Sequence, residues 1–575
     1  MNRYATAARA QFTRGALRIA LLALGAAAAL MPDLTRANDF CPDIYRAGVF
    51  PLNFSPAFMH VDKFNAPNGN TYDGLVITSF FNVIKNPDEN SNGSIGFYER
   101  DLVARITGIG YRSPSWFNAN RDVEILSDLD VASPVTPNGP GQTVWPNEAQ
   151  RVPDGILPFE AIVVPEGFHP TPQPGRLTLI NLDDPARTTY LIDQSLQDTS
   201  GSLGGTGKCR ADPNDINFDP NVQPRFYHLV KWFDMDGDGL KDAVSVRSGF
   251  KVSGAFCLPA VGEVVWFKNP GGAIDPNVEW EEFVLTPYPL NLNGSDISLD
   301  MADLEGDGVP EIVGGNFFTG ELIALFGAPV GSTWADVDGS VVLPRVAQIS
   351  TDQGAPFGVR FVDLNRDGIL DVLASNHQSD GCFRRTQDAI PGRVYALQPP
   401  ASGDIFNDPW VTHILKDNIR PNPTYPAPNN DPAGPGRLAP GLAQEFWPSP
   451  FDEATSRPWV LVGGDEASKV WLLKPNSQST TDWSYASTTI FDINDYYGAN
   501  TTQSFSAPPP ATGVSVSTIG GVAWRYDRDW AWGSYAEIYI PVFEGKDIHR
   551  ITFRPRSESM KIACPADGSL ACPVF

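Results

Sequence analysis

Three short acidic segments carry the side chains best suited to chemistry in this chain. Each fits the pattern D-x-[DNE]-x-D-G-x-x-[DE], so oxygen-bearing side chains recur at positions one, three, five and nine. In the first segment, "DMDGDGLKD", these side chains can converge on one cation, while the carbonyl of position seven supplies another oxygen. A set of hard oxygen donors selects calcium over zinc or copper, so we expect about three calcium ions in the chain.

The predicted ligands come from the same five positions of each segment. They are Asp234, Asp236, Asp238, Asp242 and the carbonyl of Leu240 in the first, Asp303, Glu305, Asp307, Glu311 and the carbonyl of Val309 in the second, and Asp363, Asn365, Asp367, Asp371 and the carbonyl of Ile369 in the third. The second segment departs from the pattern by using the longer Glu twice. Carboxylates this close repel one another without a cation, so we expect calcium to stabilise the fold.

Two other interpretations of the acidic segments compete with a calcium turn between strands. An EF-hand requires flanking helices and a glutamate at position twelve of the loop, where Ser245, Gly314 and Ala374 stand. Alternatively, the segments are solvated acidic turns that hold no metal. A further segment that begins at Asp527 keeps only the first two ligand positions, so we expect no cation there.

Strand patterns flank each acidic segment and define a repeating unit. An alternating stretch precedes the acids, an apolar stretch follows them, and a third strand begins near Gly262, Gly320 or Gly392. The unit is therefore strand, acidic turn, strand, loop, strand and a variable fourth strand.

Four weaker copies of the unit bring the number of repeats to seven. They lie near residues 58–105, near 150–195, after 457, and at 521–553. A closed ring of seven hides the strand edges that otherwise invite aggregation. We therefore predict an all-β protein, a β-propeller of seven four-stranded blades over residues 38–555. The alternative is a split into two domains near residue 210.

The acidic repeats resemble the FG-GAP and VCBS repeat family, which includes the integrin α-chain propeller and many bacterial exported propellers. The strong motifs cover residues 224–400. The resemblance implies a β-propeller with calcium in the turn that joins the first and second strands of a blade. It does not imply one activity, since the family includes adhesion modules, lyases and assembly factors.

The first 37 residues have the composition of a secretory signal peptide. Arginines precede an apolar stretch from Ile19 to Met31, and Thr35-Arg36-Ala37 offers a small-x-small cleavage site. An uncleaved membrane anchor is the alternative. No second hydrophobic run is long enough to cross a membrane, so we expect a soluble mature protein in the periplasm or outside the cell.

Charge and cysteine content agree with an exported protein. The formal net charge of -25 disfavours nucleic acid as a partner, because phosphate binding needs clustered Lys and Arg. An even number of cysteines in an exported chain favours disulfides. We expect Cys564 and Cys572 to close a small loop in the C-terminal tail, residues 556–575, and Cys209 with Cys257 is the next preferred pair among the 15 possible connectivities.

Residues on the first strand of each unit are the weak candidates for catalysis. Lys231 and Arg360 stand three positions before the first acid of their segments, where strand alternation turns them away from the apolar packing and toward a central channel. His60 and His228 also fall on proposed first strands. The alternatives are a channel of mutually paired charges and a multi-histidine copper or zinc site.

The favoured function is therefore a non-enzymatic one. We expect an exported, calcium-binding propeller that acts as a binding, adhesion or assembly module toward a protein or glycan ligand. The alternative is a secreted polysaccharide lyase or hydrolase with its site at the channel mouth, where Lys231, Arg360 or His228 would act on the substrate. Clustered aromatic residues around Trp524 either stack on sugars or fill the core.

Overall fold

A computed structural model of the chain describes its strands and most of their connections. The described residues are 44–66, 71–79, 101–109, 123–128, 145–167, 175–194, 225–253, 256–272, 274–286, 295–317, 322–337, 341–379, 390–422, 438–497, 518–527, 535–553 and 560–561. The predicted signal peptide (1–37) and the loop between Cys564 and Cys572 lie outside them. So do Cys209 and the side chain of Cys257, so the disulfide predictions stay predictions.

The strands form seven antiparallel sheets, here called blades one to seven. Blades one to three are β2 (Met59–Asn65), β3 (Thr71–Ser79), β4 (Leu102–Thr107), β5 (Val123–Asp128); β6 (Gln150–Arg151), β7 (Ala161–Pro165), β8 (Arg176–Asn181), β9 (Thr189–Gln194); and β10 (Arg225–Phe233), β11 (Asp242–Ser253), β12 (Phe256–Lys268), β13 (Glu281–Val284).

Blades four to six follow the same order along the chain. They are β14 (Ser298–Ala302), β15 (Glu311–Asn316), β16 (Leu322–Gly327), β17 (Arg345–Ser350); β18 (Pro356–Val362), β19 (Asp371–Asn376), β21 (Gly392–Gln398), β22 (Val411–Ile419); and β24 (Ala443–Phe446), β25 (Trp459–Gly463), β26 (Lys469–Pro475), β27 (Tyr485–Asp492).

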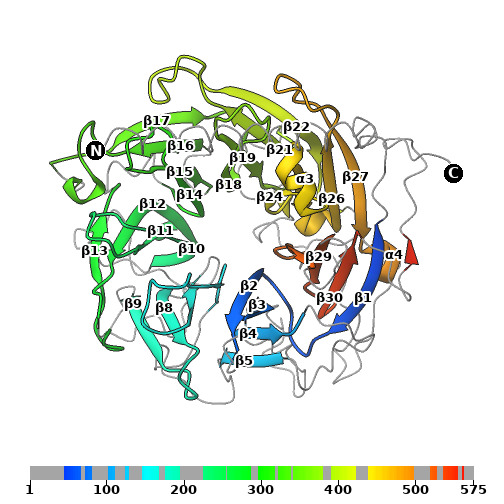
Figure 1. The fold of residues 1–575 in the computed structure, drawn as a ribbon, viewed down its shortest axis with the longest axis horizontal. Coiled ribbons are helices and arrows are strands. Elements are labelled where there is room, and N and C mark those ends of the chain that lie inside the picture. Colours follow the sequence, from blue (N-terminus) through cyan, green and yellow to red (C-terminus); the bar gives the residue numbers. More distant parts are fainter. Residues whose placement is uncertain are drawn as a thin grey trace, which may run out of the picture. The chain divides into compact units, whose positions relative to one another are not determined.

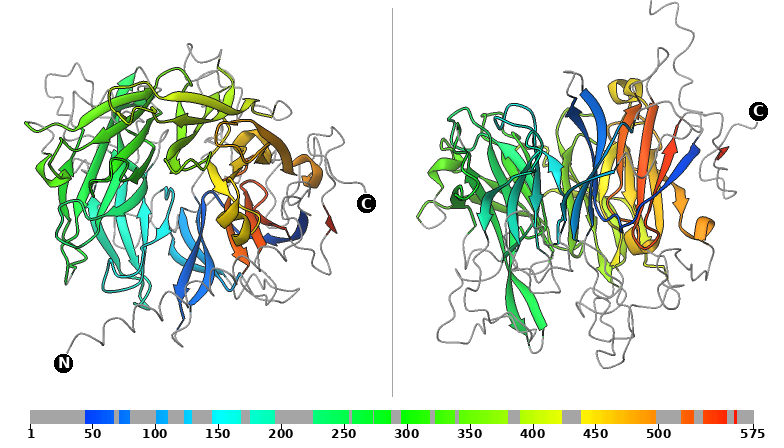
Figure 2. Two further views of the ribbon diagram at one scale, coloured as in Figure 1. Left: turned by 45° about the horizontal axis from the view of Figure 1, so that its top comes forward. Right: turned by 90° about the horizontal axis from the view of Figure 1, so that it is seen from below.

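Blade seven joins the two ends of the described chain. It contains β28 (Ala523–Asp527), β29 (Tyr535–Val542) and β30 (Asp547–Thr552), and its fourth strand is β1 (Tyr45–Pro51), with the short β31 (Met560–Lys561) beyond it. β1 pairs antiparallel with β30 over its whole length. The blades are arranged in a ring (Figure 1), and Figure 2 shows the same ring from two further sides. The prediction of an all-β, seven-bladed propeller is confirmed, and the sequence alone did not identify β1 as the closing strand.

The hydrophobic core is divided among the seven interfaces between neighbouring blades. Seven clusters of buried apolar side chains occur, and each draws its members from two adjacent blades. The cluster between blades three and four, for example, contains Val244 and Trp266 from one blade and Ile312 and Phe326 from the other. Alternating strands present one apolar face to each neighbour, so every blade packs on both sides.

Short elements complete the described structure. They are α3 (Pro450–Thr455), α4 (Asn494–Tyr497), the 3-10 turns η4 (Trp334–Asp336) and η6 (Asp465–Ala467), and the paired β20 (Gln378–Ser379) and β23 (Leu438–Ala439). Among the described residues, no helix has the length and apolar run that crossing a bilayer requires.

Candidate metal centre

The three acidic segments form the hairpin turn between the first and second strands of blades three, four and five. Asp234, Asp303 and Asp363 directly follow β10, β14 and β18, and the acid at position nine opens β11, β15 or β19. Strands flank all three turns, so the EF-hand alternative is wrong. The degenerate segment occupies the same place in blade seven, since Asp527 ends β28 and Tyr535 opens β29.

The first aspartate of each segment shapes the turn. Oδ1 of Asp234 accepts a hydrogen bond from the amide of Gly237 at 2.8 Å, and its Oδ2 accepts one from Gly239 at 2.9 Å. Both glycines adopt positive φ, 77° and 88°, where a residue without Cβ is favoured. Asp303 accepts equivalent hydrogen bonds from Gly306 and Gly308, and Asp363 accepts hydrogen bonds from the amides of Asp367 and Gly368.

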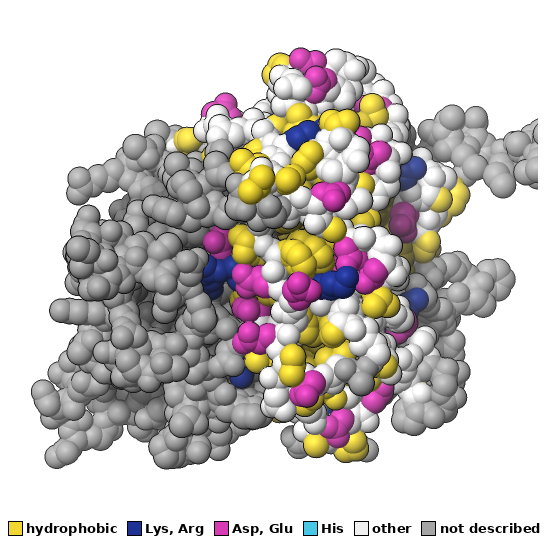
Figure 3. Space-filling model, turned by 90° about the vertical axis from the view of Figure 1, so that its left-hand side faces the viewer, with side chains coloured by type: hydrophobic (Ala, Val, Ile, Leu, Met, Phe, Trp, Pro, Cys, Tyr) yellow, Lys and Arg dark blue, Asp and Glu magenta, His cyan; other side chains and the backbone are white. Residues whose placement is uncertain are grey.

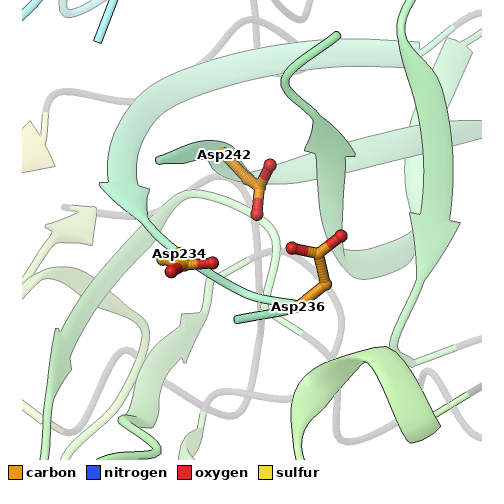
Figure 4. A group of neighbouring side chains, drawn as sticks. All are labelled: Asp234, Asp236 and Asp242. Atoms are coloured by element: carbon orange, nitrogen blue, oxygen red, sulfur yellow. The ribbon is translucent and has the colours of Figure 1, made fainter. Parts of the chain in front are cut away.

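In the first turn, three carboxylates converge. One oxygen each from Asp234, Asp236 and Asp242 lies within 4.8 Å of the others. The three side chains point toward one another (Figure 4). Asp242 is fully buried, and its two oxygens accept the amide hydrogens of Met235 and Asn269, both at 2.8 Å. Burial and the nearby acids raise the pKa of Asp242 to about 6. This donor set fits a divalent cation bound through oxygen.

A lysine contacts the same turn. Lys268, the last residue of β12, donates a hydrogen bond to Asp236, and its Nζ lies 3.3 Å from Oδ2 of Asp238. Its side chain remains 35% exposed. Asp238, a predicted ligand, is thus placed beside the lysine and not among the three converging acids.

In the second turn, an arginine lies among the predicted ligands. Arg345 forms ion pairs with Glu305 and Glu311, the acids at positions three and nine. The carboxylate of Asp307 accepts the amide hydrogen of Val309 at 2.9 Å. Among the described residues, no three acids of this turn, and no three of the third turn, bring an oxygen each within 4.8 Å of one another.

The third turn contains a buried carboxylate oxygen without a partner. Asp371 is fully buried; its Oδ2 accepts the amide hydrogen of Leu364 at 3.0 Å, while its Oδ1 has no hydrogen-bond partner. Burial, Asp367 and Asp363 raise its pKa to about 8. Asn365 donates to Asp367 at 2.8 Å. A buried carboxylate oxygen without a donor is costly, and a cation at this turn would satisfy it.

The residues at position seven behave alike in all three turns. The amides of Leu240, Val309 and Ile369 donate to the carboxylate at position five, at 2.8, 2.9 and 2.9 Å. The side chains of Leu240 and Ile369 are exposed, 37% and 55%, so they have no role in packing. Their carbonyls stay predicted ligands.

Polar contacts connect all seven pairs of neighbouring blades. Three are made by charged side chains of the first strands: Lys231 with Asp300 at 2.8 Å, Asp300 with the amide of Phe361 at 2.8 Å, and Arg360 with Glu445 at 3.0 Å. The fourth, at the closing interface, joins Arg525 of blade seven to Asp73 of blade one at 2.6 Å. The remaining three join the amide of Arg151 to Asp62, Gln150 to the carbonyl of Val230, and Gln444 to the carbonyl of Val522.

His60 of blade one and Glu148 of blade two form a further contact between neighbouring blades. The Nε2 of His60 lies 3.8 Å from Oε2 of Glu148, and both side chains keep some exposed surface, 32% and 16%. Burial within the ring, assisted by the charges of Arg360 and Lys231, lowers the pKa of His60 to about 4. Burial raises the pKa of Glu148 to about 7.

The three weak catalytic candidates, Lys231, Arg360 and His228, have different surroundings in the structure. Lys231 and Arg360 lie on the first strands of their blades, β10 and β18, and each is paired with an acid of the next blade. His228 is only 2% exposed, and its ring contacts Phe226 at a centroid distance of 5.9 Å. Burial lowers the pKa of His228 to about 3, so its ring is neutral. A residue this buried is poorly placed to meet a substrate.

Sequence reasoning missed four residues of these sites. Glu148 and Glu445 precede or lie on inner strands of blades without the acidic pattern, so nothing in the sequence sets their register. Lys268 and Arg345 lie on the third and fourth strands, 34 and 42 residues after the first acid of their turns. Only the pairing of the strands brings them to the turns.

Comparisons with known proteins show no family for this chain, and the similarity to solved structures is weak. No protein-family profile and no curated protein matches the sequence. Among solved structures, an auxiliary nutrient binding protein from Bacteroides ovatus ATCC 8483 is 10% identical with a TM-score of 0.32, covering 89% of this chain and 92% of that one. An auxiliary nutrient binding protein from Bacteroides thetaiotaomicron VPI-5482 is 9% identical with a TM-score of 0.31, covering 90% and 99%. At this level of similarity, the ligand of neither protein bears on this chain.

Proposed function

We propose that this chain is an exported β-propeller, stabilised by calcium, that acts as a binding module for a protein or glycan ligand. The observation that carries the calcium proposal is the oxygen-rich turn at the same hairpin of three consecutive blades, with an unpartnered buried oxygen on Asp371. The same turns carry the resemblance to FG-GAP and VCBS repeats. Bound calcium supplies positive charge to buried carboxylates that otherwise repel one another.

The residues that would hold the ion differ between turns. Asp234, Asp236 and Asp242 already converge in the first turn. In the third, Asp363 and Asp367 lie close enough to raise the pKa of Asp371, and Asp371 presents its free oxygen. Each turn is fixed by hydrogen bonds from the backbone to its first aspartate, so the ligands are positioned before an ion arrives.

The pairing of the channel charges favours a binding module over a lyase or hydrolase. A lyase acting on a uronic acid needs cations that are available to the substrate carboxylate. Lys231 and Arg360 are instead committed to Asp300 and Glu445, where they link neighbouring blades. Charges used in this way hold the ring together, and the outer surface is left for recognition.

Export and the acidic surface restrict the partner. The signal peptide predicted at residues 1–37 is the basis for placing the protein in the periplasm or outside the cell. On the face shown in Figure 3, the described residues include many Asp and Glu side chains and few Lys and Arg. Such a face repels phosphate backbones, which leaves proteins and glycans as the partners we propose.

A single experiment addresses both parts of the function. The mature protein is incubated with immobilised neutral and acidic polysaccharides, in calcium and in chelator, and both retention and released product are measured. We expect retention that weakens in chelator and no product. Product formation that is lost in Lys231→Ala or Arg360→Ala would instead establish the enzyme alternative. Failure to be retained on any polysaccharide would direct the search to protein ligands.

A further inference from the structure

The three acidic turns differ in the residue that faces them from the outer strands of the same blade. In each blade the last residue of the third strand pairs with the first residue of the fourth strand. These pairs are Lys268 with Glu281 in blade three, Gly327 with Arg345 in blade four, and Gln398 with Val411 in blade five. The strand register is therefore the same in these three blades. The basic residue of the pair is Lys268 on the third strand in blade three and Arg345 on the fourth strand in blade four, and the pair in blade five contains none.

We propose that Arg345 takes the place of a metal ion in the second acidic turn, so that this turn binds no calcium. The inference rests on the proposed calcium binding of the other turns and refines it. The guanidinium lies where a bound cation is expected, between the acids at positions three and nine. Its Nη1 and Nη2 lie 3.1 and 2.5 Å from the two oxygens of Glu305, and Nη2 lies 3.7 Å from Oε1 of Glu311.

The surroundings fix the guanidinium of Arg345 in this position. Its Nε donates to the carbonyl of Ala328 at 2.7 Å, and its Cζ lies 4.1 Å from the ring centroid of Phe406 in blade five. A Cβ on Gly327 would come within 2.9 Å of Nη2 and 2.5 Å of Phe406, so a glycine is needed opposite the arginine. A bidentate, stacked guanidinium is a permanent cation, because arginine does not lose its proton in proteins.

The arginine also explains why the second turn departs from the acidic pattern. Glu stands at positions three and nine, where the first turn has Asp236 and Asp242. The longer side chains reach across the turn to the guanidinium. Glu311 is nearly fully buried, with 2% of its side chain exposed. Burial raises its pKa to about 7, and the charge of Arg345 opposes that rise.

Among the described residues, no ion pair joins a basic side chain to an acid of the third turn, although the buried Arg457 of blade six donates to the carbonyl of Leu364 at 3.0 Å. Val411 and Gln398 stand at the matching positions, and neither carries a charge. The nearest basic residue along the turn, Arg366, donates instead to the carbonyls of Glu453 and Ala454 in blade six. In the first turn, Lys268 is a single flexible ammonium that reaches Asp236 and Asp238, so a divalent ion can displace it more easily than a stacked arginine.

Matched substitutions at position five of two turns test the proposal. Asp307 and Asp367 each accept the amide hydrogen of the residue two positions later at 2.9 Å, so Asp307→Asn and Asp367→Asn can both keep that hydrogen bond, although Asp367 also accepts from Asn365. Calcium bound per chain is measured after equilibrium dialysis, with calcium as the only added divalent ion. We expect Asp367→Asn to lower the bound calcium by one ion per chain, and Asp307→Asn to leave it unchanged. A loss of one ion in Asp307→Asn would overturn the proposal.

An exchange of residues between blades provides the converse test. Arg345→Val gives blade four the residue of blade five, and Val411→Arg does the opposite. The first exchange should lower the thermal midpoint in chelator and create a turn whose stability calcium restores. The second should weaken calcium binding at the third turn at least several-fold. If Arg345→Val loses no stability in chelator, the arginine does not replace a cation.

The two proposals fail in distinguishable ways. If the wild-type protein binds no calcium and Asp367→Asn changes nothing, the proposed calcium stabilisation is wrong. The role of Arg345 is then tested in chelator alone. The thermal midpoint of Arg345→Val is compared with that of the double variant Arg345→Val, Glu305→Gln. Recovery of part of the lost midpoint supports a cation that neutralises the turn, because the second substitution removes an uncompensated acid. No recovery overturns it.

Discussion

Replacing Asp371 with asparagine should change stability in opposite directions with and without calcium. The carboxylate is fully buried, one oxygen has no partner, and two further acids lie nearby. Asparagine keeps an acceptor for the amide of Leu364 and removes the charge. In chelator, Asp371→Asn should therefore raise the free energy of unfolding, whereas in calcium it should lower it, because a charged ligand is lost.

The magnitudes follow from the pKa of the carboxyl group and from the binding equilibrium. Burial and the neighbouring acids raise that pKa from 3.8 to about 8, so the group destabilises the ion-free fold as the pH rises from 3.8 to 8. At pH 7 this amounts to at most about 4 kcal/mol, at about 1.36 kcal/mol per pH unit, and asparagine recovers part of it. Calcium at about 100 times its dissociation constant stabilises the native state by about 2.7 kcal/mol.

The assay is thermal unfolding of the mature protein in calcium and in chelator. Taking roughly 2.1 cal/mol/K per residue for a cooperative unit of roughly 500 residues, about 2.7 kcal/mol corresponds to about 3 °C. We expect a midpoint above wild type in chelator and below it in calcium. Asp408→Asn, which removes an exposed acid, is the control. A variant that is equally less stable under both conditions would refute the reasoning, because only a lost hydrogen bond explains it.

Four further predictions concern the ring. Burial raises the pKa of Glu148 from 4.5 to about 7, so the stability that this carboxyl group contributes is present below pH 4.5 and is lost as the pH rises to 7. The urea midpoint of the wild-type protein should fall over this range, and Glu148→Gln should remove that fall. Burial lowers the pKa of His60 from 6.5 to about 4, so the fold loses stability as the pH falls from 6.5 to 4, because the unfolded chain takes up the proton first. His60→Gln should abolish this loss. In equilibrium unfolding, Lys231→Met should lower the free energy of unfolding by at most about 1 kcal/mol, since the ion pair of Lys231 is partly exposed. Glu537→Gln should lower it by about 3–5 kcal/mol, since the carboxylate of Glu537 binds two buried arginines. Deleting residues Tyr45–Pro51 should produce oligomers in size-exclusion chromatography, because it exposes the edge of β30; a monomer of unchanged stability would contradict the role of β1 in closure.

The blade count could be predicted because each blade repeats a local pattern. Alternation before and after Asp234, Asp303 and Asp363 sets the register of three blades, and weaker alternation suffices for the others. The closing strand could not be predicted in this way. β1 pairs with β30, which lies at the other end of the chain, and only ring closure brings the two strands together.

The candidate site also has one part that local sequence patterns predict and another that depends on strand pairing. Spacing within nine residues was enough to place the acids at the hairpin turns, and alternation was enough to turn Lys231 and Arg360 away from the apolar packing, where each pairs with an acid of the next blade. The cations that face the turns depend on strand pairing. Lys268 reaches its acids because β12 ends beside the first turn, and Arg345 reaches its acids because β17 begins beside the second turn. No local rule predicts such a contact.

An anomalous difference map from crystals grown with calcium tests the central claim most directly. The account predicts a peak in the third turn, about 2.3–2.6 Å from carboxylate oxygens of Asp363, Asp367 and Asp371. It also predicts no peak in the second turn, where the guanidinium of Arg345 lies. Crystals with saturating calcium and no peak at any acidic turn would contradict the calcium-stabilised propeller.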